Sequence, residues 1–360
     1  MSELQTHLLD KAPFGRIVPA MVTPMNHDGS VDFEAAGKLA RRLVADGADG
    51  LLVNGTTGES PATHMEEKVD LVRAVKDSVD VPVISGAGSN DTAHTVRMVE
   101  MIQEAGADAL LVVMPYYSRP SQDGVVAHFS SVCRSADRPI VLYDVPGRTG
   151  LHVTVDTYRR LAELPHVEAV KDATGDLASV PRKRRETGLT WYSGDDGLFL
   201  PFLALGAVGV ISVIAHVASG PMRRLADDFD AGDLASMPRK RRETGLTWYS
   251  GDDGLYLPFL ALGAVGVISV IAHVASGPMK RLADDFDAGD LDGARDLALR
   301  LDPLVQALNG QGQQAVMAKA ALKVAGVLDS TTMRLPNLGP GKDQLIQAEK
   351  GMKAAGLMRS

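Results

Sequence analysis

The chain has 360 residues, of which 45% are hydrophobic and 23% charged, and its formal net charge is −8. This composition is typical of a globular protein and excludes a disordered or collagen-like chain. The acidic balance gives no general attraction to nucleic acid or to an anionic membrane, whereas one local Arg or Lys can still bind a small acidic substrate. Cys133 is the only cysteine, which excludes an intramolecular disulfide and a thiolate zinc site and fits a reducing compartment.

The amino-terminal segment has no apolar core of a secretory signal, so we expect a cytoplasmic protein. The segment 197–218 carries no formal charge over 22 residues and is long enough to span a bilayer. A buried helix that runs into a buried parallel strand explains it better, because Pro201 and Gly206 interrupt the segment and its flanks carry both charge signs. We therefore expect no membrane span.

The chain contains a long internal duplication. Residues 175–234 (copy 1) recur as residues 232–291 (copy 2) at an offset of 57, and only three of the 60 aligned positions differ. The tripeptide Gly-Asp-Leu stands at both junctions, as unequal recombination between short similar stretches would leave it. A solenoid needs at least three units, and nothing else in the chain has this period. We interpret the chain as a 303-residue fold, 360 residues less 57, with one segment present twice.

Short apolar runs alternate with amphipathic stretches over the first 230 residues. The first amphipathic stretch has helical spacing from Phe33 to Val44 and ends before Gly47, which suits a helix C-cap. The predicted strands are 17–22, 50–53, 82–85, 109–113, 139–143, 167–171, 190–193 and 208–213. Crossovers of helical length make neighbouring strands parallel. Eight such units predict an α/β protein with a closed (β/α)8 TIM barrel, and an open doubly wound sheet is the alternative.

Only helical patterns follow Asp290, which predicts a helical C-terminal appendage. These patterns cover residues 294–306, 314–325 and 342–355. The predicted domains are the barrel at 1–230, the duplicate of 175–234 at 231–290, and the helical C-terminal domain at 291–360. Copy 2 adds surplus strands near 247–250 and 265–270, for which an eight-stranded barrel has no room. We expect copy 1 to complete the barrel, while exchange with copy 2, or one strand from each copy, is the alternative.

Catalytic groups of such a barrel lie where its strands end. The sequence Asn-Gly-Thr-Thr-Gly-Glu-Ser at 54–60 follows the second strand, and its hydroxyls and unhindered N–H groups suit a carboxylate or phosphate. A plain glycine turn explains this loop as well, and no P-loop lysine follows it. The sequence Gly-Ala-Gly-Ser-Asn at 86–90 is a close-approach turn that lacks the third glycine of a dinucleotide fingerprint.

Tyrosines stand at two strand ends. Tyr116 and Tyr117 follow the fourth strand, where a phenol can serve in a proton relay, although interface or lid packing explains the pair as well. Tyr143 ends the fifth strand and is expected to point into the open end of the barrel. Arg148 follows it and can bind a carboxylate bidentately, with an ion pair at the barrel rim as the alternative.

Lys171 ends the apolar sixth strand. Burial disfavours its ammonium form and lowers its pKa, which leaves the neutral amine that a Schiff base requires. An ion pair with Asp172 at the rim is the alternative. Asp195 and Asp196 follow the seventh strand and suit helix capping better than a metal or acid–base site, because no histidine is near. A lysine, tyrosines, a Thr-Thr loop and an arginine on different strand ends indicate a class I aldolase acting on a keto acid.

With these motifs the chain resembles the dihydrodipicolinate synthase/N-acetylneuraminate lyase family of pyruvate-dependent aldolases, over nearly its whole length apart from the extra copy. The motifs are GTTGES at 55–60, GAGSN at 86–90, PYYSRPSQDG at 115–124, YDVPGRTG at 143–150, VKDATGD at 170–176 and YSGDD at 192–196. The second threonine of the Thr-Thr pair and Arg148 look like the synthase branch. Sialate lyases usually have Ser-Thr in that loop and lack the arginine.

The resemblance implies a role for each catalytic candidate. Lys171 forms an imine with pyruvate, and Tyr143 shuttles protons during imine formation and condensation. Thr56 and Thr57 hold the pyruvate carboxylate, and Thr56 also joins the proton relay. Tyr117 completes this relay from a neighbouring subunit, so the resemblance implies a homodimer or homotetramer.

The resemblance also implies the substrates. Arg148 binds the carboxylate of aspartate 4-semialdehyde, and the pyruvate pocket is lined by Gly194 and Ile211 or by their duplicates Gly251 and Ile268. The implied product is 4-hydroxy-tetrahydrodipicolinate, which commits the pathway to diaminopimelate and lysine. The implied enzyme is a Schiff-base-forming lyase that needs no metal and no organic cofactor.

The chain departs from the family pattern at two places. Lysine-inhibited members carry a His or Glu in the helix after GTTGES and a Glu after the GxGxN turn, where this chain has Lys68 and His94. Lys68 repels an incoming ammonium group, so we expect weak or absent lysine feedback. The second departure is the duplication, which bears on folding rather than on the chemistry of the first six strands.

Two alternatives to the synthase function stay open. One is a 2-keto-3-deoxy sugar-acid aldolase of the same family, whose polyhydroxylated substrate does not require Arg148 as a carboxylate clamp. The other is a catalytically dead barrel that the duplicate disrupts. Its basis is the surplus apolar run of copy 2, which is an aggregation hazard unless something covers it.

Overall fold

A computed structural model describes residues 12–231, 247, 249–309, 314–333 and 337–358. The chain divides into two compact units. Unit 1 comprises Met1–Gly175 and Lys183–Asp227, and unit 2 comprises Asp176–Arg182 and Asp228–Ser360. Among the described residues, no helix has the length and apolar character needed to cross a membrane.

Unit 1 is built on eight parallel strands. They are β1 (Ile17–Pro19), β2 (Leu51–Val53), β3 (Val83–Gly86), β4 (Ala109–Val113), β5 (Ile140–Asp144), β6 (Val167–Asp172), β7 (Thr190–Ser193) and β8 (Gly209–Ser212). Their order is β1-β8-β7-β6-β5-β4-β3-β2, and a parallel bridge between Ala20 and Leu52 joins the two outer strands. The strands therefore form a nearly closed barrel, which confirms the predicted TIM barrel, and each one overlaps a predicted segment.

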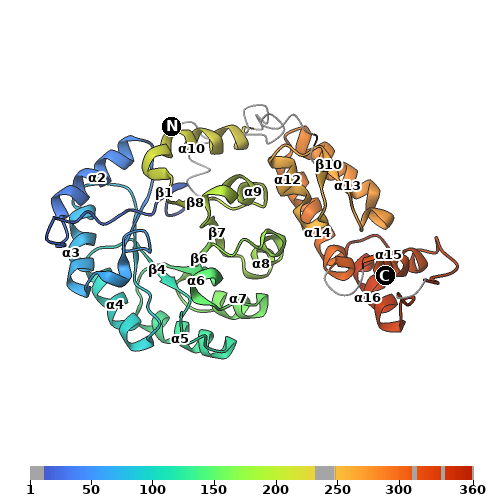
Figure 1. The fold of residues 1–360 in the computed structure, drawn as a ribbon, viewed down its shortest axis with the longest axis horizontal. Helices are drawn as coiled ribbons and strands as arrows, with labels where there is room; N and C mark the ends of the chain where they lie inside the picture. The colour runs from blue at the N-terminus through green and yellow to red at the C-terminus, as the bar shows by residue number, and fades with distance from the viewer. Residues whose placement is uncertain (1–11, 232–246, 248, 310–313, 334–336, 359–360) are drawn as a thin grey trace. The chain divides into compact units, whose positions relative to one another are not determined.

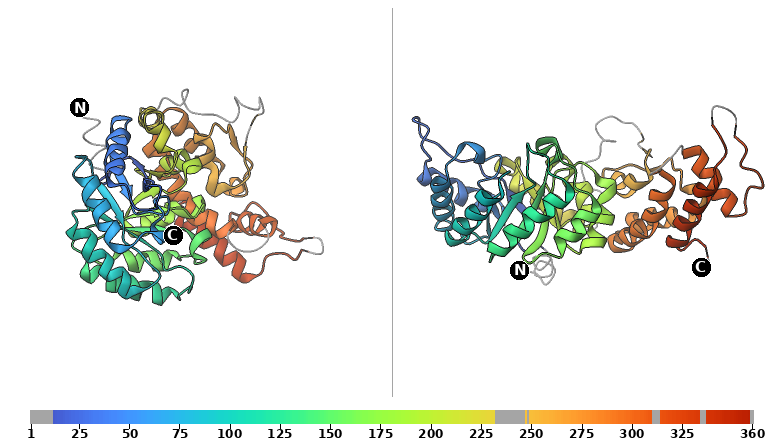
Figure 2. Two further views of the ribbon diagram at one scale, coloured as in Figure 1. Left: turned by 60° about the vertical axis from the view of Figure 1, so that its left-hand side comes forward. Right: turned by 90° about the horizontal axis from the view of Figure 1, so that it is seen from below.

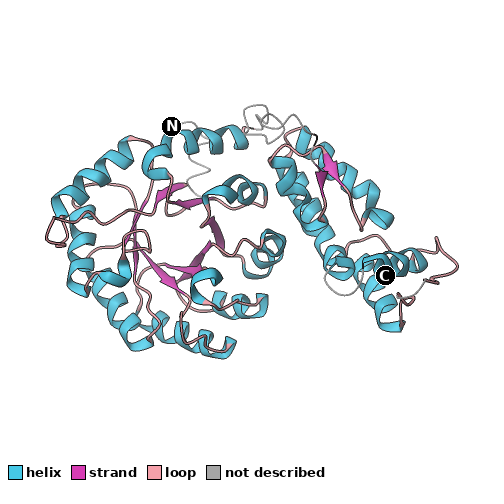
Figure 3. Cartoon of the chain, in the orientation of Figure 1, coloured by secondary structure: helices cyan, strands magenta, loops and turns pink. Residues whose placement is uncertain are grey.

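Helices lie outside this ring of strands (Figures 1 and 3). They are α2 (Phe33–Ala45), α3 (Met65–Lys76), α4 (Thr92–Glu104), α5 (Gln122–Ser135), α7 (Val155–Ala162), α8 (Val180–Thr187), α9 (Phe199–Ala204) and α10 (Ala215–Asp230). Asp32 caps α2 by accepting a hydrogen bond from the Ala35 N–H at 2.9 Å. Gly47, with φ +111°, lets the chain turn out of that helix into the next strand, as its position in the sequence predicts. Figure 2 shows these helices from two further sides.

Apolar side chains fill the interior of the barrel. Every strand contributes at least one of them: Val18, Leu52, Ile84, Leu111, Val141, Ala169, Tyr192 and Ile211. Phe14 joins them, and its backbone N–H donates to the Tyr192 hydroxyl at 3.3 Å. The barrel is thus a packed core, and only its carboxyl end is open to polar chemistry.

Unit 2 contains copy 2 and the C-terminal helices. Its elements are β9 (Tyr249–Ser250), α12 (Tyr256–Ala261), β10 (Gly266–Val267), α13 (Ala272–Asp287), α14 (Leu291–Asn309), α15 (Gln314–Val324) and α16 (Lys342–Ala354). The last three helices overlap the predicted helical segments and confirm the C-terminal appendage. Within the described ranges, β9 and β10 pair only with each other.

The two copies have the same local structure in different surroundings. Strands β7 and β8 of the barrel come from copy 1, and β9 pairs with β10 in the register in which β7 pairs with β8. Ile211 of copy 1 is 1% exposed, whereas its counterpart Ile268 is 74% exposed. The structure groups copy 2 with the C-terminal helices, so the separate domains at 231–290 and 291–360 stay a prediction.

Candidate active site

A pocket of about 480 Å³ opens at the carboxyl ends of β2 to β5. Parallel barrel strands all end on one face, so motifs that are far apart in the sequence meet there. The lining includes residues from the four predicted loops: Asn54, Gly55, Thr56, Gly86, Gly88, Ser89, Tyr116, Tyr143 and Arg148. This convergence marks the pocket as the candidate active site.

Lys171 and Tyr143 lie on adjacent strands in direct register. The Lys171 amine is 4.5 Å from the centroid of the Tyr143 ring. Lys171 is only 6% exposed and is not itself part of the pocket lining, so the Tyr143 side chain connects the amine to the pocket. A buried amine beside a phenol is the pair of groups that an imine-forming enzyme needs.

Burial lowers the pKa of Lys171 to about 8, and the positive charge of Arg148 contributes to this shift. The carboxylate of Asp196 acts in the opposite direction and raises the same pKa. At pH 7 about one tenth of Lys171 is therefore the neutral, nucleophilic amine, far more than at the ordinary lysine pKa. The rim ion pair with Asp172 is not formed, because the Asp172 carboxylate binds Thr174 and the Trp191 indole instead.

Tyr143 has a polar neighbour on each side. Burial raises the pKa of its phenol, while the charge of Arg148 and a hydrogen bond with the Thr56 side chain lower that pKa. The structure thus joins Thr56, Tyr143 and Lys171 in a row from the second strand end to the sixth. Such a row can pass a proton between substrate and lysine.

The loop after β2 is fixed by contacts to its own neighbours. Asn54 adopts a left-handed backbone with φ +54°, and its amide donates to the Lys68 carbonyl at 3.1 Å and to the Ser85 hydroxyl at 2.9 Å. A Cβ on Gly86 would come within 2.0 Å of the Asn54 carbonyl oxygen, so only glycine fits at that position. These contacts hold Thr56 exposed at the rim of the pocket.

Arg148 lies on a single helical turn, α6 (Pro146–Thr149), directly after β5. Pro146 occupies the first position of this turn, where its fixed φ suits a helix start. Arg148 is exposed and lines the pocket, so its guanidinium can receive a carboxylate from solvent. This placement fits the predicted clamp, whose role stays a prediction.

Asp144 and Asp172, which follow Tyr143 and Lys171 in the sequence, take part in a buried polar network. The Tyr158 hydroxyl donates to Asp144 at 2.7 Å, and the Trp191 indole N–H donates to Asp172 at 3.0 Å. The Lys183 amine lies 3.9 Å from the Asp172 carboxylate, and both side chains are nearly inaccessible. Burial raises the pKa of Asp144 to about 6. The network ties the ends of β5 and β6 to α7 and α8.

The two aspartates after β7 have different functions. Asp195 accepts from the Gly197 N–H at 2.8 Å and caps the short helix Asp196–Leu198, as predicted. Asp196 is not a cap, because its carboxylate accepts from the backbone N–H groups of Val213 and Ile214 just after β8. Asp196 is a residue that the sequence pattern alone did not place in the site. Its position three residues after a barrel strand could have indicated a site residue, but a helix-capping role explains that position equally well.

The structure brings some predicted site residues together and leaves others apart. Ile211 packs in the core with Tyr143, and the Gly194 N–H donates to the Asp172 carbonyl beside Lys171 at 2.7 Å. The predicted site residues outside the pocket lining are Thr57, Tyr117, Lys171, Gly194, Ile211, Gly251 and Ile268. Tyr117 is 88% exposed with φ +69°, and Gly251 and Ile268 are exposed in unit 2.

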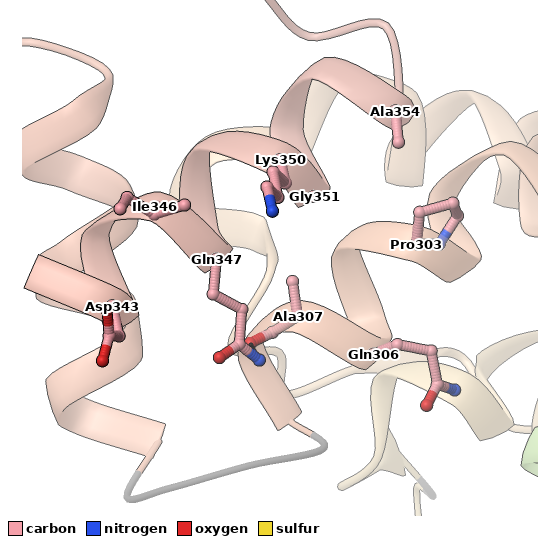
Figure 4. A pocket seen from close by; sticks show the side chains of 9 residues that line it. All are labelled: Pro303, Gln306, Ala307, Asp343, Ile346, Gln347, Lys350, Gly351 and Ala354. Carbon is pink, nitrogen blue, oxygen red and sulfur yellow. Dashed lines mark hydrogen bonds between the residues drawn. The ribbon is translucent and has the colours of Figure 1, made fainter.

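Other candidate sites carry less chemistry. Among the described residues, no group of three His, Cys, Asp or Glu side chains is arranged to hold a metal ion. A second pocket lies in unit 2 between α14 and α16, where Pro303, Ala307 and Gly351 form an apolar floor and Gln347 and Lys350 stand beside it (Figure 4). None of the predicted site residues lines it.

The chain is similar to known proteins over almost its full length. It is 63% identical to 4-hydroxy-tetrahydrodipicolinate synthase of Bifidobacterium longum over 358 residues, which are 99% of this chain and 100% of the relative. A dihydrodipicolinate synthase structure from Cyanidioschyzon merolae with lysine bound matches with a TM-score of 0.58 and 32% identity, covering 96% of this chain and 99% of the other. The corresponding structure from Bacillus anthracis matches with a TM-score of 0.57 and 32% identity, covering 94% and 98%.

The family model for the dihydrodipicolinate synthetase family matches the chain in two pieces, residues 13–244 and 235–355. The two pieces overlap within copy 2 and together cover both units. A single family model that matches twice in this way agrees with one family fold in which a segment is repeated. The chain belongs to the dihydrodipicolinate synthetase family.

Proposed function

We propose that this protein is a Schiff-base lyase that condenses pyruvate with aspartate 4-semialdehyde to give 4-hydroxy-tetrahydrodipicolinate. The observation that carries the proposal is the buried amine of Lys171 over the Tyr143 ring at the end of the barrel. The full-length similarity to a relative named 4-hydroxy-tetrahydrodipicolinate synthase supports the choice of reaction. Lysine and diaminopimelate biosynthesis is the pathway that this product serves.

Imine formation uses the neutral amine of Lys171. The amine attacks the keto carbon of pyruvate and a C–N bond forms. With one proton taken up, the carbonyl oxygen leaves as water and a protonated imine remains. In this proposal Tyr143 donates the proton to the departing oxygen and Thr56 returns one to Tyr143, and the hydrogen bond between the two side chains supports these roles. In this proposal the hydroxyls of Thr56 and Thr57 bind the pyruvate carboxylate, and Gly194 and Ile211 contact the other side of pyruvate.

Carbon–carbon bond formation follows from the protonated imine. Loss of a proton from the methyl carbon gives an enamine, which attacks the aldehyde carbon of the second substrate. This regenerates the protonated imine, and the aldehyde oxygen takes up a proton to become a hydroxyl group. The amino group of that substrate then attacks the imine carbon, the bond to Lys171 breaks, and the ring closes. Arg148 at the rim is suited to hold the carboxylate of aspartate 4-semialdehyde during these steps.

We propose that Tyr117 acts in the active site of a neighbouring subunit. Its side chain is 88% exposed and lies outside the pocket of its own chain. A neighbouring subunit of a homodimer or homotetramer would bring this phenol to the Thr56–Tyr143 row. We also assign the enzyme to the cytoplasm, in line with a single buried cysteine.

The proposal is tested by trapping the imine. Purified protein is incubated with pyruvate and sodium borohydride, and intact and peptide masses are measured. We expect one adduct, on Lys171, and none in Lys171→Arg. Turnover with aspartate 4-semialdehyde then identifies the reaction, and cleavage of 2-keto-3-deoxy sugar acids in its place would favour the sugar-acid aldolase. Soluble protein without any adduct would refute the imine mechanism for the 360-residue chain.

A further inference from the structure

Asp196 of copy 1 and Asp253 of copy 2 make the same local contacts. The Asp196 carboxylate accepts from Val213 N–H at 3.1 Å and from Ile214 N–H at 3.0 Å. The Asp253 carboxylate accepts from the two matching N–H groups of copy 2, both at 3.1 Å. In both residues the second oxygen, Oδ1, is buried and accepts no hydrogen bond within the described part of the chain. Each carboxylate therefore ties the end of one strand to the end of the next.

The two carboxylates differ in what faces them. Asp253 also accepts from the Asn309 side-chain amide at 2.9 Å, which is a neutral partner. Asp196 instead acts electrostatically on Lys171, whose ammonium form it stabilises. The same arrangement thus occurs twice in the chain: Asp253 is hydrogen-bonded to an amide, and Asp196 lies within electrostatic reach of the active-site amine.

The backbone explains why Asp196 reaches this position. Ser193 at the end of β7 is in register with Asp172, the residue after Lys171. The next residue, Gly194, donates its N–H to the Asp172 carbonyl at 2.7 Å. A Cβ on Gly194 would lie only 3.0 Å from Ala173, so the turn lies close against the end of β6. The chain then leads directly to Asp196.

We propose that Asp196 is the counter-charge of the Lys171 nitrogen and a positioning residue for the proposed reaction. It holds the ends of β7 and β8 together and keeps a negative charge beside the nitrogen that becomes cationic. This inference rests on the proposed function, because the cation it serves is the protonated imine formed with pyruvate. In that step the Lys171 amine, the pyruvate keto group and one proton give the protonated imine and one water.

Two charged groups act on the pKa of Lys171 in opposite directions. Arg148 on α6 is the cation that disfavours a charged Lys171, and Asp196 after β7 is the anion that favours it. Tyr143 on β5 is a neutral phenol, whose pKa burial raises. The Asp172 carboxylate accepts hydrogen bonds from the Thr174 hydroxyl and the Trp191 indole. Asp196 thus opposes the effects of burial and of Arg148 at the nitrogen, without cancelling them.

The pH dependence of imine trapping tests this assignment. Initial rates of pyruvate and borohydride labelling are measured between pH 6 and 9 for wild type, Asp196→Asn, Asp196→Glu and Asp253→Asn. Asn keeps an oxygen for the Val213 and Ile214 N–H groups but removes the charge. Loss of the charge lowers the pKa of Lys171, so the rising limb of the profile should move to lower pH by about one unit. The plateau rate should fall, because the protonated imine loses its counter-charge.

The other variants separate charge from structure. Asp196→Glu keeps the charge and should keep the wild-type midpoint. Asp253→Asn makes the same change of charge in unit 2 and should leave the profile unchanged. If Asp196→Asn is insoluble, Asp196→Ser removes the charge in its place. A wild-type midpoint in a neutral variant of Asp196, or an equal shift in Asp253→Asn, would overturn the assignment. Absence of any adduct in the wild-type protein would instead refute the proposed function itself.

Discussion

The amine of Lys171 and the ring of Tyr143 are 4.5 Å apart on adjacent strands that are in direct register. Because register fixes the two backbones, the pair does not depend on a loop for its geometry. Tyr192 is in register with Lys171 on the opposite side and directs its hydroxyl to the Phe14 N–H instead. Lys171 thus lies between two tyrosines, of which only Tyr143 lines the pocket.

Tyr143→Phe should keep the ring beside the amine and remove only the phenol. Because a positioned acid–base group contributes about 10²–10⁴-fold to a rate, turnover should fall by that factor while slow labelling of Lys171 persists. Steady-state kinetics and adduct masses check this. Tyr192→Phe is the matched control and should stay within a few-fold of wild type. Equal losses in both variants would assign the effect to packing rather than to proton transfer.

Arg148→Ala should affect the second substrate more than the first. A hydrogen bond to a charged group contributes about 1.5–3 kcal/mol, so the KM for aspartate 4-semialdehyde should rise by roughly 10- to 100-fold. Pyruvate labelling should remain. Its rising limb should shift to higher pH, because the charge of Arg148 lowers the pKa of Lys171. An unchanged KM for the semialdehyde would remove Arg148 from substrate recognition.

Asp144→Asn should make the stability of the barrel less sensitive to pH. Burial raises the pKa of Asp144 from 3.8 to about 6, so the folded state binds the proton more tightly than the unfolded chain. The protonated form stabilises the fold below pH 4, and this stabilisation is lost as pH rises through 6, by up to about 3 kcal/mol. The amide cannot ionise and should be more stable than wild type at pH 7.

Urea unfolding of both proteins at several pH values measures this difference. The advantage of Asp144→Asn should shrink toward zero as pH falls from 7 to 4. Tyr158 can still donate its hydrogen bond to the amide oxygen, so the contact itself is preserved. A stability difference that stays constant with pH would show that folding does not raise the pKa of Asp144.

The strand ends and their chemistry are predictable from the sequence, because the apolar runs of a parallel barrel end on one face. Lys171, Tyr143 and Arg148 follow from this rule. The role of Asp196 does not, because a carboxylate near a helix start looks the same whether it caps the helix or bridges to the next strand. Only the contacts to Val213 and Ile214 distinguish the two.

The different surroundings of the two copies cannot be predicted from the local sequence either. Ile211 and Ile268 stand in the same sequence context, yet one is buried in the barrel and the other is 74% exposed. The same holds for Tyr192, which is fully buried, and Tyr249, which is 50% exposed. The local pairing of β9 with β10 is preserved, so these differences arise from the strands available on either side.

Ile211→Ala and Ile268→Ala form a matched pair that reports which copy completes the barrel in solution. Truncation of a buried isoleucine costs about 2–5 kcal/mol, whereas an exposed substitution changes stability by about 0.5 kcal/mol or less. Ile211→Ala should therefore lower the unfolding midpoint and weaken pyruvate labelling, and Ile268→Ala should change neither. The reverse pattern would place copy 2 in the barrel, and equal effects would indicate exchange between the copies.

Lysine feedback should be weak or absent, because Lys68 already brings a cation to the pocket lining. Lys68 is 6% exposed and lines the pocket, and its amine donates to the Thr63 carbonyl at 2.5 Å. His94 lies on the same lining, so neither position offers a carboxylate to an incoming ammonium group. A lysine titration of the condensation rate should show no inhibition below millimolar concentrations. Lys68→Gln removes the repulsion and should bind lysine more tightly than wild type, while sub-millimolar inhibition of the wild type would contradict the electrostatic argument.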